Sequence, residues 1–455
     1  MGPRSGEGKE QPGQIVPADP RHAAAARRGS GRQGPGAGVA LETAGAKVLE
    51  RLRDRPGGPE LLELAQDRAD MELVGGAVRD LLLERNPREL DVVVARDAPA
   101  LARMLGERLA AEVTVHERFG TAFVERGETR LDFATCRAES YPAPGALPEV
   151  RTGTPMEDLL RRDFTVNAIA MTLDGPNPGE LRAVPHALED LRERRLRVLH
   201  DTSFQDDPTR LLRLARYRAR LGFALEEHTA ELARGALSGG ALETVSGARV
   251  GAELRLALRE EKAPAALEAM QELGVLAAVH PRLRHDTALV QRALQLLPPD
   301  GSRQGLLLAS LMLELVLRAD GRPQTEARAL LDRLEFPQGE RDGAVAGAMA
   351  AVRLHELLPR CERPAELHTA VADSTVEGVA LAGALGAADA ARRWLGDLRH
   401  VRLHIDGEDL LAQGVPQGPE IGRRLRETLM LRLDGELEEG REAELAAALE
   451  LPWPS

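Results

Sequence analysis

The chain has 455 residues, with 72 Asp and Glu against 60 Lys and Arg and a formal net charge of −12. This length suits about three domains with ordinary hydrophobic cores. The acidic balance excludes a basic surface over the whole chain, so any RNA site must be a local patch. The two cysteines, Cys136 and Cys361, are too few for a disulfide framework or a four-cysteine zinc site. Aromatic residues make up 2%, which leaves hydrogen bonding rather than stacking to recognise a base.

Residues 1–44 are rich in Gly, Pro, Ala and Arg and lack periodic apolar positions, which predicts a disordered N-terminal extension. They contain no apolar run of the roughly 7–15 residues that a signal peptide needs. The longest apolar run of the chain, near residues 306–317, is too short for a membrane span. We therefore expect a protein that does not contact membranes and that works in the cytoplasm, in agreement with its low cysteine content.

Short strands are expected in the first part of the chain and long helices in the rest. Up to about residue 134, helical spacing alternates with short runs of β-branched residues bounded by Gly and Pro. The predicted fold is therefore α+β, with a small mixed-sheet head followed by a mostly α-helical neck, body and tail. Strands are predicted at residues 71–74, 90–95, 112–116, 121–125 and 130–134, with a further pair at 169–173 and 181–184. The predicted parts are residues 1–44 (extension), 45–178 (head), 179–262 (neck), 263–400 (body) and 401–455 (tail).

The first motif that carries chemistry is LVGGAVRD, a strand and turn leading into a helix. Gly75 and Gly76 allow backbone amides to approach a phosphate, and Arg79, one turn later, can bind the same anion. The motif matches neither the P-loop nor the GxGxxG fingerprint. We interpret it as a cradle for a triphosphate, with an ordinary tight turn as the alternative.

A strand with paired carboxylates follows. Glu89 and Asp91 are two residues apart, so both project from one face of the strand. Carboxylates at this spacing can share divalent metal ions, which activate a sugar hydroxyl and neutralise a triphosphate. Asp132, in RLDFAT, is the candidate third carboxylate. A solvated strand edge is the alternative interpretation.

Two later motifs combine arginines with acidic residues. In RRDFTVNAIA, Arg162 can pair with a phosphate while Asp163 and Asn167 bond a ribose hydroxyl, and helix capping is the alternative role of Asp163. In DDPTRLLRLAR, two acids precede a helix whose arginines share one face, and capping alone would also explain the acids. The residues of this second motif that we predict to contact the nucleotide are Asp206, Asp207, Arg210, Arg213 and Arg216.

In this order, LVGGAVRD, ELDVVV, RRDFTVNAIA and DDPTRLLRLARYRARLGF resemble the motifs of the bacterial and eukaryotic class of tRNA nucleotidyltransferases, class II, and of their poly(A) polymerase relatives. Near the C-terminus, HIDGEDLLAQGVPQGPEIGRRL resembles the family's tRNA-binding tail, where we predict that Arg423 and Arg424 bind RNA. Two departures from the family pattern keep the charge, since Glu89 stands where Asp is usual and Asp206 where Glu is usual.

The resemblance implies template-free addition of C and/or A, from CTP and ATP, to the 3′ end of tRNA. Glu89 and Asp91 would hold Mg²⁺, pyrophosphate would leave, and no protein partner is implied. Asp207 and Arg210 would read the Watson–Crick edge in place of a template. Cytosine and adenine offer an amino donor to the carboxylate and ring acceptors to the guanidinium, whereas guanine and uracil reverse this polarity.

Several alternatives remain at this point. A poly(A) polymerase shares every head motif, and some bacteria divide the work between a CC-adding and an A-adding enzyme. A metal-dependent phosphohydrolase is suggested by His280 and by the pair His285 and Asp286, although no further ligands fall into an evident order. A catalytically inactive RNA-binding scaffold is the remaining alternative, which the intact carboxylates disfavour.

Overall fold

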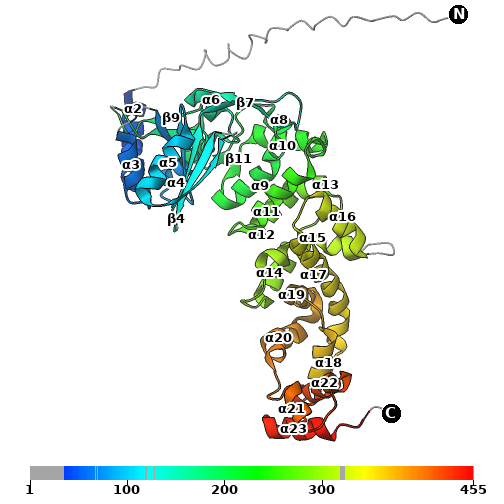
Figure 1. Cartoon of the computed structure of the whole chain (residues 1–455). Helices are drawn as coiled ribbons and strands as arrows, with labels where there is room; N and C mark the ends of the chain where they lie inside the picture. The colour runs from blue at the N-terminus through cyan, green and yellow to red at the C-terminus, as the bar shows by residue number, and fades with distance from the viewer. Residues whose placement is uncertain are drawn as a thin grey trace, which may run out of the picture. The chain divides into compact units, whose positions relative to one another are not determined.

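The computed structural model describes residues 35–66, 68, 70–117, 120–127, 129–175, 177–317 and 323–453. The chain forms two compact units, whose elements are labelled in Figure 1. The head unit comprises Met1–Cys136, Gly153–Leu160 and Asn167–Leu188. The helical unit comprises Arg137–Thr152, Arg161–Val166 and Glu189–Ser455. No helix among the described residues is long and apolar enough to cross a membrane.

A seven-stranded mixed sheet forms the centre of the head unit, in the order β3-β4-β5-β2-β1-β8-β9. Neighbouring strands are antiparallel except β2 and β5, which run parallel. The strands are β1 (Met71–Val74), β2 (Leu90–Val94), β3 (Glu112–His116), β4 (Thr121–Arg126), β5 (Thr129–Thr135), β8 (Ile169–Thr172) and β9 (Leu181–Ala183). Every strand predicted for this unit is present, and its ends agree to within one residue.

The alternation of side chains along β2 gives the sheet two different faces. Leu90, Val92 and Val94 are buried, and Leu131 and Phe133 of β5 lie opposite the first two of them in the parallel register. The helix α5 (Ala98–Leu109) packs against β4 and β5. Because successive side chains of a strand point to opposite faces, the acidic residues between these apolar positions lie on the other face of the sheet.

Among its described residues the head unit has four further helices: α2 (Pro35–Arg53), α3 (Gly58–Gln66), α4 (Gly76–Leu82) and α6 (Pro155–Leu160). The helix α2 begins ten residues before the predicted start of the head, inside the segment expected to be disordered. Proline loses no hydrogen bond as the first residue of a helix, and several Ala, Leu and Glu residues that follow favour helix. The rest of the predicted extension, residues 1–34, lies outside the described residues.

The helical unit contains an antiparallel hairpin, β6 (Arg137–Ser140) and β7 (Glu149–Thr152), and a short parallel pair, β10 (Arg195–Leu196) and β11 (Ala224–Leu225). Its first helices are α7 (Ala187–Glu193), α8 (Ser203–Asp206), α9 (Arg210–Leu221), α10 (Glu227–Ser238), α11 (Gly247–Leu258), α12 (Ala263–Leu273), α13 (Val275–Val279) and α14 (Thr287–Leu296). The remaining α-helices are α15 (Arg303–Leu317), α16 (Pro323–Arg333), α17 (Gln338–Leu357), α18 (Pro364–Ala370), α19 (Val376–Ala382), α20 (Ala388–Gly396), α21 (Gly407–Ala412), α22 (Pro419–Leu433) and α23 (Arg441–Glu450). The prediction of a mostly helical C-terminal part is confirmed.

Short helical turns connect several of these elements. The 3₁₀ turns are η2 (Thr165–Asn167), η3 (Ala241–Thr244), η4 (Leu358–Arg360) and η6 (Leu398–His400), and η5 (Gly383–Ala387) is a π-helical turn. Within η5, Gly386 has a φ of 147°, which a residue with a side chain rarely adopts. The chain therefore bends between α19 and α20.

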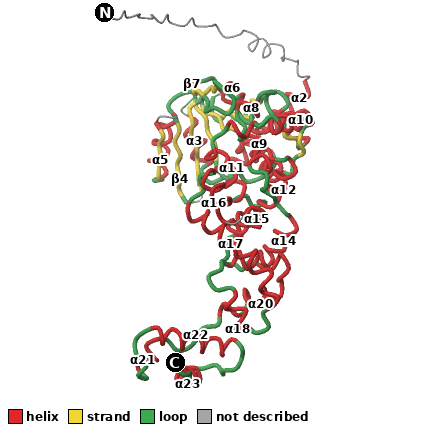
Figure 2. Tube along the Cα trace, turned by 90° about the vertical axis from the view of Figure 1, so that its right-hand side faces the viewer, coloured by secondary structure: helices red, strands yellow, loops and turns green. Residues whose placement is uncertain are grey.

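The C-terminal segment has a hydrophobic core of its own. Ile405, Leu410, Val415 and Ala448 are buried together, and Figure 2 shows α21, α22 and α23 grouped around the C-terminus. The division into extension, head, neck, body and tail stays a prediction. Three segments differ from it: residues 137–152 and 161–166, which we predicted in the head, belong to the compact helical unit, and residues 179–188, which we predicted in the neck, belong to the head unit.

Candidate active site

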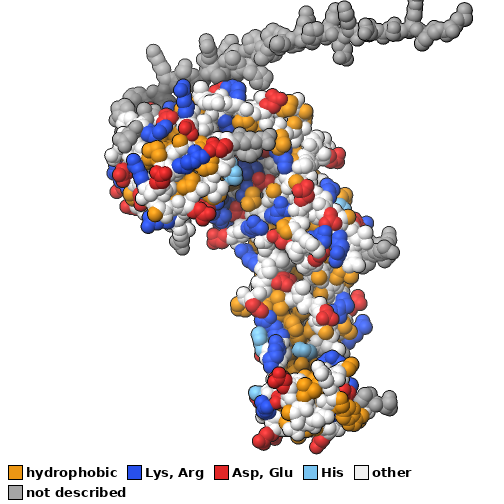
Figure 3. All heavy atoms as spheres, viewed as in Figure 1, with side chains coloured by type: hydrophobic (Ala, Val, Ile, Leu, Met, Phe, Trp, Pro, Cys, Tyr) orange, Lys and Arg blue, Asp and Glu red, His pale blue; other side chains and the backbone are white. Residues whose placement is uncertain are grey.

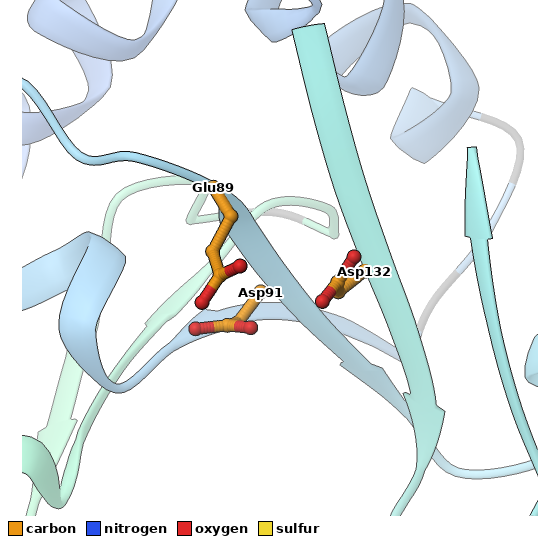
Figure 4. Close-up of side chains that lie close together, drawn as sticks. All are labelled: Glu89, Asp91 and Asp132. Atoms are coloured by element: carbon orange, nitrogen blue, oxygen red, sulfur yellow. The ribbon is translucent and has the colours of Figure 1, made fainter. Parts of the chain in front are cut away.

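Three carboxylates meet on the face of the head sheet opposite the apolar face. Glu89 immediately precedes β2, Asp91 lies on β2, and Asp132 lies opposite Asp91 on the parallel neighbour β5. One oxygen of each lies within 4.8 Å of the others, and Figure 4 shows the side chains pointing toward one another. Among the described residues this is the one group of three or more acidic, His or Cys side chains at such distances. The prediction that these residues lie together is confirmed, and neither His280 nor His285 belongs to a comparable group.

The cluster consists of hard oxygen donors, the ligands that Mg²⁺ prefers. Glu89 and Asp132 are partly exposed, with 48% and 30% of their side chains accessible, so a hydrated ion can reach them. No cation was predicted in this cluster. Arg130 of β5 donates from Nε to Oδ1 of Asp132 at 2.9 Å, and this hydrogen bond raises the pKa of the guanidinium. The residues present therefore fit a divalent ion, and Arg130 balances part of their charge.

The glycine turn between β1 and α4 adopts the conformation that its sequence requires. Gly75 has a φ of 69°, in the region that favours glycine, and its N–H donates to the carbonyl of Ile169 at 2.9 Å. The side chain of Arg79 lies beneath the turn, because a Cβ placed on Gly76 would be 3.5 Å from Nη2 of Arg79. Only 1% of the Arg79 side chain is exposed.

Arg79 is bound within the head unit. It forms an ion pair with Asp80 at 2.8 Å and donates to Oδ1 of Asn167. Both Arg79 and Asn167 were predicted to contact the nucleotide, and in this structure they contact each other. Their direct contact with a nucleotide stays a prediction, whereas their role in bracing the turn follows from the hydrogen bonds.

In the helical unit, the arginines of α9 are also engaged. Arg213 donates to Oδ2 of Asp163 at 2.6 Å and 2.9 Å and pairs with Glu253 at 3.3 Å. Arg216 pairs with Glu253 at 3.0 Å and with Glu260 at 3.4 Å. The predicted arginine stripe is therefore an ion-pair network that joins α9 to α11 and to the segment around Asp163. Contacts of these residues with a nucleotide are not visible here and stay predictions, as does the phosphate contact of the half-buried Arg162.

The predicted base-reading pair lies at the start of α9. Arg210 is buried and donates to Oγ of Ser203 at 2.6 Å and to the carbonyl of Arg161 at 2.8 Å. Asp207 accepts three hydrogen bonds on Oδ1, two from Thr209 at 3.0 Å and 2.6 Å and one from Arg249 at 2.8 Å. Its other oxygen, Oδ2, accepts none from the part of the chain that the structure describes. Asp206 is more exposed and accepts from Thr202 at 3.1 Å.

Arg249 is a residue of this region that the sequence analysis missed. Besides Asp207, it donates from Nη1 to the carbonyl of Gly145 at 2.9 Å, in the loop between β6 and β7. The same loop approaches η3 closely, because a Cβ on Gly145 would lie 2.1 Å from Oγ1 of Thr244. Arg249 thus links the hairpin loop to the candidate base reader. Its separation from Asp207 by 42 residues leaves no local sequence pattern by which to find it.

The two tail arginines are placed differently from one another. Arg423 is partly exposed and pairs with Glu420 and Glu427 on its own helix. Arg424 is 1% exposed, donates to the carbonyl of Ala448 at 2.6 Å, and has its guanidinium carbon 4.6 Å from the ring centre of Trp453. Arg424 is therefore an interior residue of the tail, which removes the support for its predicted contact with RNA. On the face drawn in Figure 3, basic and acidic side chains are interspersed over the helical unit.

A carboxylate cluster on a small mixed sheet, followed by a helical unit, is the arrangement expected of a metal-dependent nucleotidyltransferase. The family described as Poly A polymerase head domain matches residues 71–197, and that described as Probable RNA and SrmB-binding site of polymerase A matches residues 222–286. The CC-adding tRNA nucleotidyltransferase of Deinococcus radiodurans is 32% identical over 397 residues, covering 86% of this chain and 92% of that relative. The chain belongs to the tRNA nucleotidyltransferase family, as its motifs predicted.

Two further comparisons agree with this assignment. The A-adding tRNA nucleotidyltransferase of Geobacter sulfurreducens is 31% identical over 412 residues, which cover 86% of this chain but 46% of that relative. The chain thus spans about half the length of this relative. The solved structure of the Thermotoga maritima CCA-adding enzyme complexed with tRNA is 26% identical, with a TM-score of 0.70 over 89% of this chain and 98% of that one. These likenesses extend through both the head unit and the helical unit.

Proposed function

We propose that this chain adds C and/or A, from CTP and ATP, to the 3′ end of tRNA without a nucleic-acid template, releasing pyrophosphate. The observation that carries the proposal is the convergence of Glu89, Asp91 and Asp132 on one face of the head sheet. Relatives named for A addition, CC addition and CCA addition support the substrate class. We also propose that the chain works in the cytoplasm, where tRNA and both nucleotides are available.

In the proposed reaction the three carboxylates would hold Mg²⁺, and the bound ion would lower the pKa of the terminal ribose hydroxyl and neutralise phosphate charge. Asp91 would supply oxygens from β2, Glu89 from the position just before that strand, and Asp132 from β5. Asp91 and Asp132 lie on two hydrogen-bonded strands, which hold them in place before substrate arrives and reduce the cost of organising the site. Because the N–H of Gly75 already donates to the carbonyl of Ile169, a backbone donor for the triphosphate at this turn would come from Gly76.

Base choice is assigned to Asp207 and Arg210. The oxygen Oδ2 of Asp207 is left for the amino group of cytosine or adenine, because Oδ1 already accepts three internal donors. Arg210 donates to Ser203 and to the carbonyl of Arg161, and its remaining N–H groups would donate to the ring acceptors of the same bases. A guanine or uracil would set a carbonyl against the carboxylate and an N–H against the guanidinium, at a cost of roughly 1–3 kcal/mol for each unpaired group.

The test is incorporation of labelled CTP or ATP, in Mg²⁺, into tRNAs that end before, within and after the CCA sequence. The proposal expects addition that stops at a defined length on at least one of these tRNAs, and the accepted ends show whether the product is CC, A or CCA. Long A tracts on unrelated RNA would instead identify a poly(A) polymerase. Absence of transfer to every RNA, with the carboxylates intact and Mg²⁺ present, would refute the proposal.

A further inference from the structure

Arg130 occupies a particular place in the carboxylate cluster. It lies two residues before Asp132 on β5, so both side chains are on the same face of the sheet. The guanidinium uses two nitrogens on this one carboxylate, with Nε 2.9 Å from Oδ1 and Nη2 3.3 Å from Oδ2. The same Nε lies 3.7 Å from an oxygen of Glu89. Two of the three metal-binding carboxylates are therefore already paired with a cation of the chain itself.

Arg130 also has partners that no metal ion would take. Glu125, directly across the strand pair on β4, accepts from Nη1 at 3.0 Å. The guanidinium carbon lies 4.6 Å from the ring centre of Phe123, a cation–π arrangement. Arg130 can therefore release Asp132 and Glu89 and remain bound on its other side, without becoming an isolated charge.

A purely structural role explains these contacts poorly. About 41% of the Arg130 side chain is exposed, and its acidic partners are 30% to 48% exposed. Ion pairs with this exposure contribute little to folding stability. Their effect on a cation that must bind the same oxygens is direct, because the guanidinium both occupies the ligand atoms and lowers the negative charge that attracts the ion.

We propose that Arg130 is an internal counter-ion of the carboxylate cluster that competes with the divalent metal for Asp132 and Glu89. The proposal rests on the assignment of these carboxylates to a metal. In the metal-free protein the guanidinium holds the side chains of Asp132 and Glu89 together against their mutual repulsion. When a metal ion binds, the guanidinium leaves Asp132 and Glu89 and keeps its contacts with Glu125 and Phe123. Arg130 thereby sets the metal concentration at which the site fills.

The test is direct metal binding to the full chain, with Mn²⁺ as the probe and free Mn²⁺ measured by electron paramagnetic resonance. Arg130→Gln should bind Mn²⁺ about fivefold more tightly than the wild type, or roughly 1 kcal/mol at about 1.4 kcal/mol for each factor of ten. Arg126→Gln, at the exposed end of β4, removes the same charge from the same sheet and should change the affinity less than about twofold, since solvent and salt screen it.

Two further variants keep the possible failures apart. Asp91→Asn removes a ligand and should weaken Mn²⁺ binding at least tenfold, and unchanged binding would overturn the metal assignment itself and with it the proposed function. If Asp91→Asn weakens binding but Arg130→Gln does not tighten it beyond Arg126→Gln, the counter-ion role alone is wrong. Arg130→Lys keeps the charge but cannot form both hydrogen bonds to Asp132, so its Mn²⁺ affinity should lie between those of the wild type and Arg130→Gln. It decides the question if melting curves show that Arg130→Gln is unfolded.

Discussion

Asp207→Asn should do more than remove a charge, because its surroundings determine which way the new amide points. In the wild type, Oδ1 accepts from the backbone N–H of Thr209 and from Nη2 of Arg249, groups that can only donate. The amide oxygen of the variant must take this position. The NH₂ group is then directed to the position of Oδ2, where the wild type offers an acceptor to the base.

The size of this preference follows from the two obligate donors. Turning the amide over would set an NH₂ group against both of them, and an unsatisfied buried donor costs roughly 1–3 kcal/mol. At the lower end the cost is about 2 kcal/mol, or a factor of about 30 in favour of the orientation with NH₂ toward the base. The hydroxyl of Thr209, which can donate or accept, does not change this result.

The expected result is a loss of use of CTP and ATP with a gain for UTP and GTP. A donor would now face the amino group of C or A, lowering kcat/KM for the cognate nucleotide by about 10- to 150-fold, which corresponds to about 1.4–3 kcal/mol. Carbonyl oxygens of U and G would find a partner, while Arg210 still opposes their ring N–H. The preference for CTP and ATP over UTP and GTP should therefore be lost, but it should not be fully reversed.

The assay is incorporation of each of the four nucleotides singly on a tRNA primer. Asp201→Asn, an exposed carboxylate of the same unit, is the matched control and should keep the wild-type preference. Replacing Arg249 by Leu in the Asp207→Asn background removes one obligate donor and should restore part of the use of C and A. An active Asp207→Asn enzyme that stays as strict as the wild type would refute the assignment of Asp207 as base reader and return it to a helix-capping role.

Three further predictions follow from single residues. Asp91→Asn should lower turnover more than tenfold and leave tRNA binding, measured by filter binding, unchanged. A variant that keeps even a tenth of wild-type turnover at saturating Mg²⁺, a loss of less than about 1.4 kcal/mol, contradicts the role of Asp91 as a metal ligand. Burial holds the pKa of His285 below its usual value, so on acidification the unfolded chain binds the proton at a higher pH than the folded protein does. The free energy of unfolding should therefore fall as the pH drops through about 6.5. His285→Leu should make this fall smaller in urea unfolding between about pH 7 and pH 5, and an unchanged pH dependence of the free energy of unfolding contradicts this prediction. Arg424→Ala removes a buried donor from two carbonyls of α23 and should destabilise the tail by roughly 2–4 kcal/mol. Melting curves should show a far larger effect than for Arg423→Ala, and equal melting temperatures of the two variants would contradict the burial of Arg424.

The strands of the head were predictable because their signals are local. Runs such as Leu90 to Val94 combine β-branched residues with clear breaks, and the spacing of Glu89 and Asp91 already places both on one face. The motif around Asp132 suggests that this residue joins them, but the motif alone does not establish it. The position of Asp132 depends on the parallel pairing of β2 with β5 across the intervening helix and hairpin, and pairing between distant strands has no local sequence signature.

The contacts of the arginines were the least predictable feature. The sequence predicted ligand contacts for three arginines, Arg79, Arg213 and Arg424. In the structure each of them pairs with a carboxylate of its own unit. Sequence shows that an arginine is present and on which helical face, but its partner lies 50 residues away for Arg213 and 88 for the Asn167 contact of Arg79. Only packing decides whether such a residue binds a ligand or braces the protein.

At position 89, where aspartate is usual in the family pattern, glutamate can still reach the other two carboxylates. Glu89 stands one residue before the first residue of β2, where the chain is not yet held by the ladder, so its extra methylene can be accommodated by the backbone and by side-chain rotation. Its carboxylate still comes within 4.8 Å of the other two. The longer side chain also lies within 3.7 Å of Arg130, which supplies an electrostatic reason to fold inward before any metal is bound. Glu89 therefore keeps both the charge and the position that an aspartate would supply to this cluster.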